Sequence, residues 1–269
     1  GFVGSHLCET LLGQGHQVTV VDDLSTGQFE NIAHLTGQRR FRFAIDTITN
    51  KVVMDRLVSE CDLVVHLAAA VGVELIIKDP VHVIETNILG TRAVLQAACR
   101  YRKKVLLAST SEIYGKSEQI PFREDDDRVV GSSTKARWCY AASKAVDEFL
   151  GLAYHRQFEL PVVVFRLFNT VGPRQTGRYG MVVPRFVSQA LAGEALGVYG
   201  DGSQTRCFLH VADAVTAITA LADSPQAVGE VFNVGSTHEI SIMDLARKVL
   251  ERVDAYRAVA GGLDEPYRY

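Results

Sequence analysis

The chain has 269 residues, of which 47% are apolar, so it is long enough to bury a large core in one or two domains. It carries 28 Lys and Arg against 31 Asp and Glu, and this net charge of −3 excludes a strongly basic surface for nucleic acid or an acidic membrane. Five irregularly spaced cysteines favour reduced thiols over a disulfide framework or a zinc site. No apolar run is long enough to span a bilayer. From the charge, the cysteines and this absence together, we predict a cytoplasmic protein without metal, nucleic-acid or membrane partners.

The chain begins with a glycine-rich turn. Residues 1–4 (Gly-Phe-Val-Gly) lead into a helical pattern, and the strand-like residues 17–21 end at Asp22. In a strand–turn–helix–strand unit, the glycines let the backbone approach a pyrophosphate, and an acidic residue after the second strand holds the adenosine ribose. The first glycine of this fingerprint, and the first strand, would precede Gly1. The pattern predicts dinucleotide binding, and Asp22 favours NAD over NADP because a carboxylate repels a 2′-phosphate.

Strand and helix patterns alternate over the next part of the chain. Predicted strands cover 42–45, 62–67, 104–108 and 160–168, and predicted helices cover about 52–59 and 81–101. Short apolar strands separated by helices imply a parallel sheet with helices on both faces. We therefore predict an α/β fold in which residues 1–168 form a Rossmann-type, doubly wound NAD-binding domain. Residues 169–269 mix turns with single helices, which predicts a smaller, partly interleaved substrate domain.

A tyrosine and a lysine lie four residues apart in a further predicted helix. Tyr140 and Lys144 therefore share one helix face. The unperturbed pKa of a phenol is about 10, and an adjacent ammonium lowers this pKa and favours the phenolate. Alone, this spacing is more typical of an ordinary amphipathic helix. His66, which lies in an apolar predicted strand, is interpreted as a core residue and not as a base or ligand. The pair predicts a catalytic base only in combination with other motifs.

Eight motifs, in this order, resemble the extended short-chain dehydrogenase/reductase family, and specifically its sugar-nucleotide epimerases, dehydratases and decarboxylases. The resemblance covers nearly the whole chain, and the set is far more specific than any single motif. The motifs are Gly-Phe-Val-Gly-Ser-His-Leu (1–7), Val-Val-Asp-Asp-Leu-Ser-Thr-Gly (20–27), His-Leu-Ala-Ala (66–69), Ser-Thr-Ser-Glu-Ile-Tyr-Gly (109–115), Tyr-Ala-Ala-Ser-Lys (140–144), Arg-Leu-Phe-Asn-Thr-Val-Gly-Pro-Arg (166–174), Val-Tyr-Gly-Asp-Gly-Ser-Gln-Thr-Arg (198–206) and Phe-Asn-Val-Gly (232–235).

The resemblance implies NAD as the cofactor and a UDP-sugar as the substrate. It places the pyrophosphate at Gly1 and Gly4, the ribose at Asp22 and the adenine at Asp46. The implied cofactor-binding residues are Gly1, Phe2, Val3, Gly4, Asp22, Asp46, Thr47, Leu67, Ala68, Ala69, Asn87, Tyr140 and Lys144. The implied substrate-binding residues are Thr110, Asn169, Arg178, Val183, Tyr199 and Arg206.

The resemblance also implies the catalytic roles. Thr110 would hydrogen-bond the sugar 4-hydroxyl, and Tyr140 would take its proton. Lys144 would bind the nicotinamide ribose and lower the pKa of the tyrosine, while Glu112 would aid later proton transfers. The family commonly forms homodimers through two paired helices, here those that contain Asn87 and Tyr140.

The motifs divide between reactions that share a 4-keto intermediate and bound NADH. Tyr-Ala-Ala-Ser-Lys resembles the epimerases, whereas the sequence Thr-Ser-Glu from Thr110 resembles the decarboxylases and dehydratases. The family's decarboxylases more often carry acidic or glycine residues between the tyrosine and the lysine. We therefore favour an isomerase, a 4-epimerase of a UDP-hexose or UDP-hexuronate. The alternatives are a UDP-glucuronate decarboxylase, a sugar-nucleotide 4,6-dehydratase and a non-catalytic NAD-binding regulator, and the intact Thr110, Tyr140 and Lys144 argue against the regulator.

Overall fold

The computed structural model describes residues 1–177 and 181–260. Its α-helices are α1 (Phe2–Gly13), α2 (Glu30–Ala33), α3 (Lys51–Ser59), α4 (Val73–Lys78), α5 (Pro80–Tyr101), α6 (Cys139–Phe158), α7 (Val182–Ala192), α8 (Val211–Asp223) and α9 (Ile242–Ala260). Its strands are β1 (Val18–Asp22), β2 (Phe41–Ile45), β3 (Leu63–His66), β4 (Lys104–Thr110), β5 (Val162–Leu167), β6 (Thr170–Val171), β7 (Thr205–Cys207), β8 (Leu209–His210), β9 (Val231–Val234) and β10 (Glu239–Ser241). Three short 3-10 helices are η1 (Ser111–Tyr114), η2 (Ala136–Trp138) and η3 (Pro225–Ala227).

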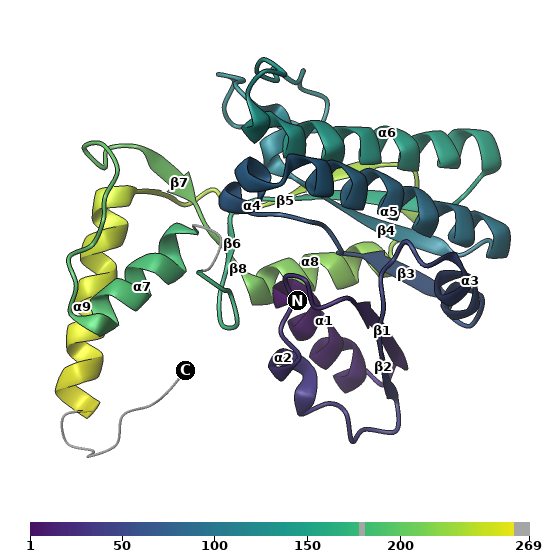
Figure 1. Cartoon of the computed structure of the whole chain (residues 1–269), viewed down its shortest axis with the longest axis horizontal. Coiled ribbons are helices and arrows are strands. Elements are labelled where there is room, and N and C mark those ends of the chain that lie inside the picture. Colours follow the sequence, from purple (N-terminus) through teal and green to yellow (C-terminus); the bar gives the residue numbers. More distant parts are fainter. Residues whose placement is uncertain (178–180, 261–269) are drawn as a thin grey trace.

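The predicted strands lie in two parallel sheets. A four-stranded sheet has the order β3-β4-β5-β9, and β1 pairs with β2. In the larger sheet, Leu107 of β4 lies opposite His66 on one side and Val164 on the other. The helices cover both faces, which is why β4 and β5 are almost entirely buried and apolar. The α/β, Rossmann-type fold predicted from the sequence is therefore confirmed (Figure 1).

Successive residues of β4 point to opposite faces and reach different helices. Leu106 packs with Leu7 of α1 and Ile218 of α8. Leu107 packs instead in the cluster that contains Val94 of α5 and Met54 of α3. The sheet is thus sandwiched between α1 with α8 and α3 with α5. None of the helices formed by the described residues is both long and apolar enough to cross a membrane.

Part of the predicted second domain returns to the large sheet. β9 pairs with β5 in parallel, and α8 packs on the face shared with α1. In contrast, α7 and α9 pack on each other through Phe186 and Val249, and Figure 1 shows them to one side of the sheet. The division of the chain at residue 168 stays a prediction.

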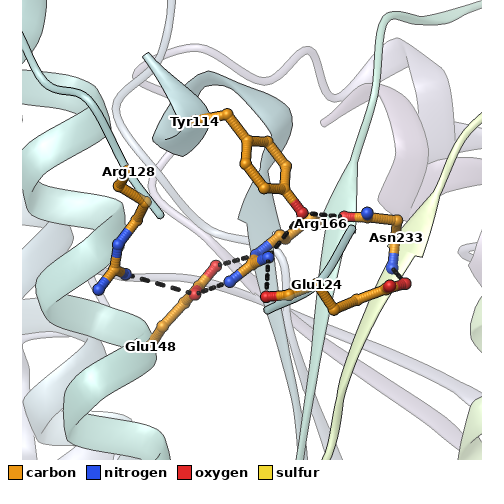
Figure 2. A network of polar contacts seen from close by, with 6 residues as sticks. All are labelled: Tyr114, Glu124, Arg128, Glu148, Arg166 and Asn233. Carbon is orange, nitrogen blue, oxygen red and sulfur yellow. Dashed lines mark hydrogen bonds and ion pairs between the residues drawn. The ribbon is translucent and has the colours of Figure 1, made fainter. Parts of the chain in front are cut away.

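A buried ion pair joins β5 to α6. Arg166 donates from Nη2 to Glu148 Oε2 at 2.8 Å and from Nε to Oε1 at 3.0 Å. Its Nη1 donates to the Tyr114 hydroxyl at 2.6 Å and to the Glu124 carbonyl at 2.9 Å. The Tyr114 hydroxyl donates in turn to Asn233 Oδ1 of β9 at 2.7 Å (Figure 2). One guanidinium therefore fixes α6, η1 and the loop around residue 124 relative to the sheet.

We predict that Glu148→Gln lowers the free energy of unfolding by about 3 kcal/mol, because Arg166 would stay buried opposite a neutral partner. The side chains of Arg166 and Glu148 are only 6% and 3% exposed. Glu60→Gln is the matched control, since Glu60 pairs with two exposed arginines, and its cost should stay below about 1 kcal/mol. Urea denaturation measures both variants, and equal losses would contradict the prediction.

Candidate active site

The start of α1 and the end of β1 meet at the predicted dinucleotide site. A Cβ atom on Gly1 would lie 3.9 Å from Asp22 Oδ2, and the Leu24 N–H donates to Oδ1 at 2.8 Å. A Cβ atom on Gly27 would lie 2.8 Å from Asp22 Oδ2, so only glycine lets this turn pass so close to the carboxylate. The N–H groups in the first turn of a helix have no partner within the helix, and the helix dipole is positive at that end. The first turn of α1, a helix of 12 residues, therefore favours a phosphate. This donor set, beside a carboxylate for ribose hydroxyls, fits NAD.

Asp46 and Thr47 lie at the same end of the sheet as Asp22. Asp22 is in register with Ile45, so Asp46 follows one residue beyond that pair. The Thr47 N–H donates to Asp46 Oδ1 at 2.8 Å, and Asn50 Nδ2 lies 3.1 Å from both carboxylate oxygens. These bonds hold the Asp46 carboxylate in place after β2.

Asn87 ties the loop after β3 to α6. Its Oδ1 accepts the Ala70 N–H at 2.8 Å, and its Nδ2 donates to the Ala70 carbonyl at 3.3 Å and to Ser143 Oγ at 3.0 Å. Ser143 Oγ also donates to the carbonyl of Tyr140 at 2.9 Å. The amide of Asn87, 1% exposed, is thus directed at the protein itself. Any effect of Asn87 on a cofactor would act through residues 67–70, which include the predicted Leu67, Ala68 and Ala69.

Three of the predicted catalytic side chains come together where β4 ends and α6 begins. Tyr140, the second residue of α6, is 6% exposed and hydrogen-bonds the hydroxyl of Thr110. Thr110 Oγ1 also accepts the Glu112 N–H at 3.2 Å. Glu112 keeps contact with solvent, yet the protein around its carboxyl group raises its pKa by desolvation, while the charge of Arg137 lowers it. The carboxyl group of Glu112 is close enough for its charge to act on Tyr140.

The pKa of Tyr140 is raised above its ordinary value in this structure, and the role of Lys144 in lowering it stays a prediction. Burial is the largest cause, followed by the charge of Glu112; the Thr110 hydrogen bond lowers the pKa, and the charge of Asp147 raises it further. The ammonium of Lys144 is paired with Asp147, with Nζ 2.8 Å from Oδ2. Asp147 is not among the predicted site residues; its place three residues after Lys144, within reach on the same helix, is the signal in the sequence.

Apart from Thr110, the predicted substrate residues follow β5 in the chain, and those that the structure describes lie on loops, on α7 and on β7. Asn169 Nδ2 donates to the carbonyl of Cys207 at 3.0 Å, which places Asn169 against β7, the strand that carries the exposed Arg206. Tyr199 is 74% exposed, and the guanidinium of Arg185 lies 4.6 Å from the centre of its ring. Val183 lies in the first turn of α7. Arg178 lies outside the described residues.

The structure also has a surface groove away from the predicted site residues. A groove of about 530 Å³ between α7 and α9 is lined by none of the predicted site residues. Within residues 1–177 and 181–260, no group of three or more His, Cys, Asp or Glu side chains is arranged to hold a metal ion.

Known proteins resemble this chain over most of its length. A model of the NAD dependent epimerase/dehydratase family matches residues 1–235. The UDP-N-acetyl-alpha-D-glucosaminuronate decarboxylase of Bacillus cytotoxicus is 47% identical over 250 residues, which cover 93% of this chain and 76% of that protein. UDP-glucuronic acid decarboxylase 1 of Xenopus tropicalis is 40% identical over 94% of this chain, which spans only 58% of that protein. UDP-glucuronic acid 4-epimerase from Bacillus cereus, solved in complex with UDP-glucuronic acid and NAD, superposes with a TM-score of 0.85 at 31% identity, covering 97% of this chain and 81% of that one.

We predict that Asp22→Ala weakens NAD binding about ten- to hundredfold, because the ribose hydroxyls lose a charged hydrogen-bond acceptor. Its affinity for NADP should fall less, since the repulsion of the 2′-phosphate is removed as well. Asp23→Ala is the matched control, because the Asp23 carboxylate bonds Ser25 in the same turn. Calorimetric titration with both cofactors measures the ratio of NAD to NADP affinity. An unchanged NAD affinity in Asp22→Ala would refute the role of Asp22 in binding the ribose.

Proposed function

Since the chain belongs to the NAD-dependent epimerase/dehydratase family, we propose that it decarboxylates a UDP-hexuronate, with NAD regenerated in each turnover. The observation that carries this proposal is the 47% identity, over 93% of the chain, to a UDP-N-acetyl-alpha-D-glucosaminuronate decarboxylase. It favours the decarboxylase alternative over the 4-epimerase preferred from the residues between Tyr140 and Lys144. The position of Glu112 beside Thr110 supports the same choice.

The residues near Tyr140 match what decarboxylation requires. NAD, when bound, supplies a reversible oxidation at C4 of the sugar. Tyr140 takes the proton of the 4-hydroxyl, and Thr110 orients that hydroxyl by a hydrogen bond. A ketone at C4 makes the C6 carboxylate a β-keto acid, so the C5–C6 bond breaks and CO2 leaves with its electron pair left on C5. The net reaction consumes one proton and converts a UDP-hexuronate into a UDP-pentose and CO2.

Glu112 is the group that we assign to the proton taken up at C5. Desolvation raises its pKa, so at a given pH a larger fraction of Glu112 is protonated than for an exposed glutamate. A carboxylic acid next to Thr110 lies on the side of the site where the sugar 4-hydroxyl is expected. A 4-epimerase moves no proton on carbon and has no use for such an acid.

The UDP group would occupy the loops around β7. Arg206 is exposed, and its guanidinium can bind diphosphate oxygens in a bidentate manner. Asn169 holds the strand that carries it. The exposed ring of Tyr199, backed by Arg185, offers a flat surface for the base. We assign these roles as part of the proposal.

We predict that the full chain loaded with NAD releases CO2 from UDP-glucuronate or UDP-N-acetylglucosaminuronate, with the UDP-pentose product identified by NMR. Glu112→Gln should slow release by about 10²-fold while NAD affinity is kept, because the acid for C5 is lost. Glu118→Gln, an exposed site in the following loop, is the matched control. A product that keeps its carboxylate and is inverted at C4 would establish an epimerase instead, and failure to turn over either sugar would favour the regulator.

We also propose a homodimer formed through α5 and α6, which run side by side in Figure 1. Their outward faces carry large apolar side chains, with Val81 and Leu89 of α5 at 62% and 48% exposed and Phe149 of α6 at 59%. Sedimentation velocity should show twice the mass of one chain. Leu89→Lys should reduce that mass to one chain, because a charge would be buried in the interface. A wild-type monomer would refute the proposal.

A cytoplasmic location stays a prediction. All five cysteines are free thiols, as expected in a reducing compartment. Burial raises the pKa of Cys8 to about 11, which keeps this thiol protonated and unreactive.

A further inference from the structure

Two charged side chains, one helical turn apart on α6, are buried together. The side chain of Lys144 is 4% exposed and that of Asp147 is 0% exposed, with 2.8 Å between Nζ and Oδ2. Each charge has lost its hydration, so either one left without the other would be strongly unfavourable. This pair therefore differs from the exposed pairs that lie three or four residues apart on other helices, such as Asp244 with Arg247.

The neighbouring titratable groups supply no second anion to Lys144, so its counter-charge in this part of the structure is Asp147. From β3, His66 is neutral, because burial first and the charge of Lys144 second lower its pKa to about 3. From α5, Thr91 Oγ1 lies 3.0 Å from His66 Nε2 and also bonds the Asp147 carboxyl group. On α6 itself, Glu148 is engaged by the guanidinium of β5, and its charge reaches Asp147 only as a repulsion.

The carboxyl group of Asp147 depends on the ammonium. Burial raises its pKa, and the charge of Lys144 and their hydrogen bond lower it. Among the described residues, Asp147 Oδ1 has no hydrogen-bond partner, whereas Oδ2 makes the ion pair with Lys144. The charges that act on Tyr140 are those of Glu112 from η1 and Asp147 from α6, and both raise its pKa, while the neutral Thr110 of β4 hydrogen-bonds it.

We propose that Asp147 is a positioning residue whose carboxylate fixes the ammonium of Lys144 and offsets the effect of that charge on the phenol of Tyr140. The inference rests on the proposed role of Tyr140 as the base. It adds a residue, Asp147, that determines the pH above which Tyr140 is deprotonated. Removal of the negative charge takes away a group that raises the pKa of Tyr140, and it leaves the ammonium of Lys144, four residues along α6, uncompensated. Both changes favour the phenolate. A base with a lower pKa stays deprotonated to lower pH.

Asp147→Asn tests this, because it removes the charge and keeps the shape. In the NAD-loaded protein, NMR of isotope-labelled tyrosine follows the titration of Tyr140, identified by the signal missing from Tyr140→Phe. We expect titration in Asp147→Asn to begin about one pH unit lower than in the wild type. Asp244→Asn is the matched control, since it breaks an exposed ion pair of the same spacing on α9, and it should leave the titration unchanged.

The pH dependence of kcat/KM for CO2 release gives a second readout. Its acidic limb should move to lower pH in Asp147→Asn, a change that loss of stability alone does not produce. Tyr140 titrating as in the wild type, or at higher pH, overturns the inference, as does an equal shift in Asp244→Asn. If Asp147→Asn does not fold, Asp147→Ser must show the same downward shift. A shifted titration in a protein that releases no CO2 would refute the proposed reaction and keep the inference.

Discussion

The contact between Arg166 and Glu148 fixes the position of α6, the helix that carries Tyr140 and Lys144. Tyr140 and Lys144 both lie on α6, and Thr110 lies at the end of β4, so their alignment requires α6 to hold one place along the sheet. Apolar packing by itself allows a helix to slide, whereas a guanidinium bonded in two places to one carboxylate has a single geometry. The same guanidinium bonds Tyr114, at the end of the short helix that contains Glu112. One buried guanidinium therefore holds both α6, with Tyr140, and η1, with Glu112.

Two adjacent carboxylates of α6 have divided tasks. Glu148 faces the sheet and anchors the helix, while Asp147, the residue before it, faces α5 and β3 and pairs with Lys144. Successive residues of a helix point about 100° apart, so neighbouring acids can reach different layers of the fold. A shift of α6 along the sheet would break the pair between Glu148 and Arg166, whereas Lys144 and Asp147 lie on the same helix and would move together.

Local patterns were sufficient to predict the central strands and the position of the reacting tyrosine. β4 and β5 are buried on both faces, so their unbroken apolar runs identify them, and the four-residue spacing of Tyr140 and Lys144 follows from helix geometry. The two-residue strands β6 and β8 exist only because they pair with each other across the fold, and no local pattern predicts them. The burial of Asp147 depends on Thr91 and His66, which are distant in sequence. An Asp-Glu pair in a helix is otherwise typical of an exposed face, which is why its role was missed.

The return of β9 to the large sheet decides in what order the molecule can assemble. Val164 of β5 pairs with Val231, so one side of the sheet stays open until the last third of the chain has been made. Such non-local parallel pairing is slow, and an uncovered strand is prone to aggregate while it waits. A fragment that ends after β5 would also lack α8, which covers Phe165 and Leu106. We therefore expect a fragment that ends after β5 to be less stable than the whole chain, even though most of the motifs lie before that point.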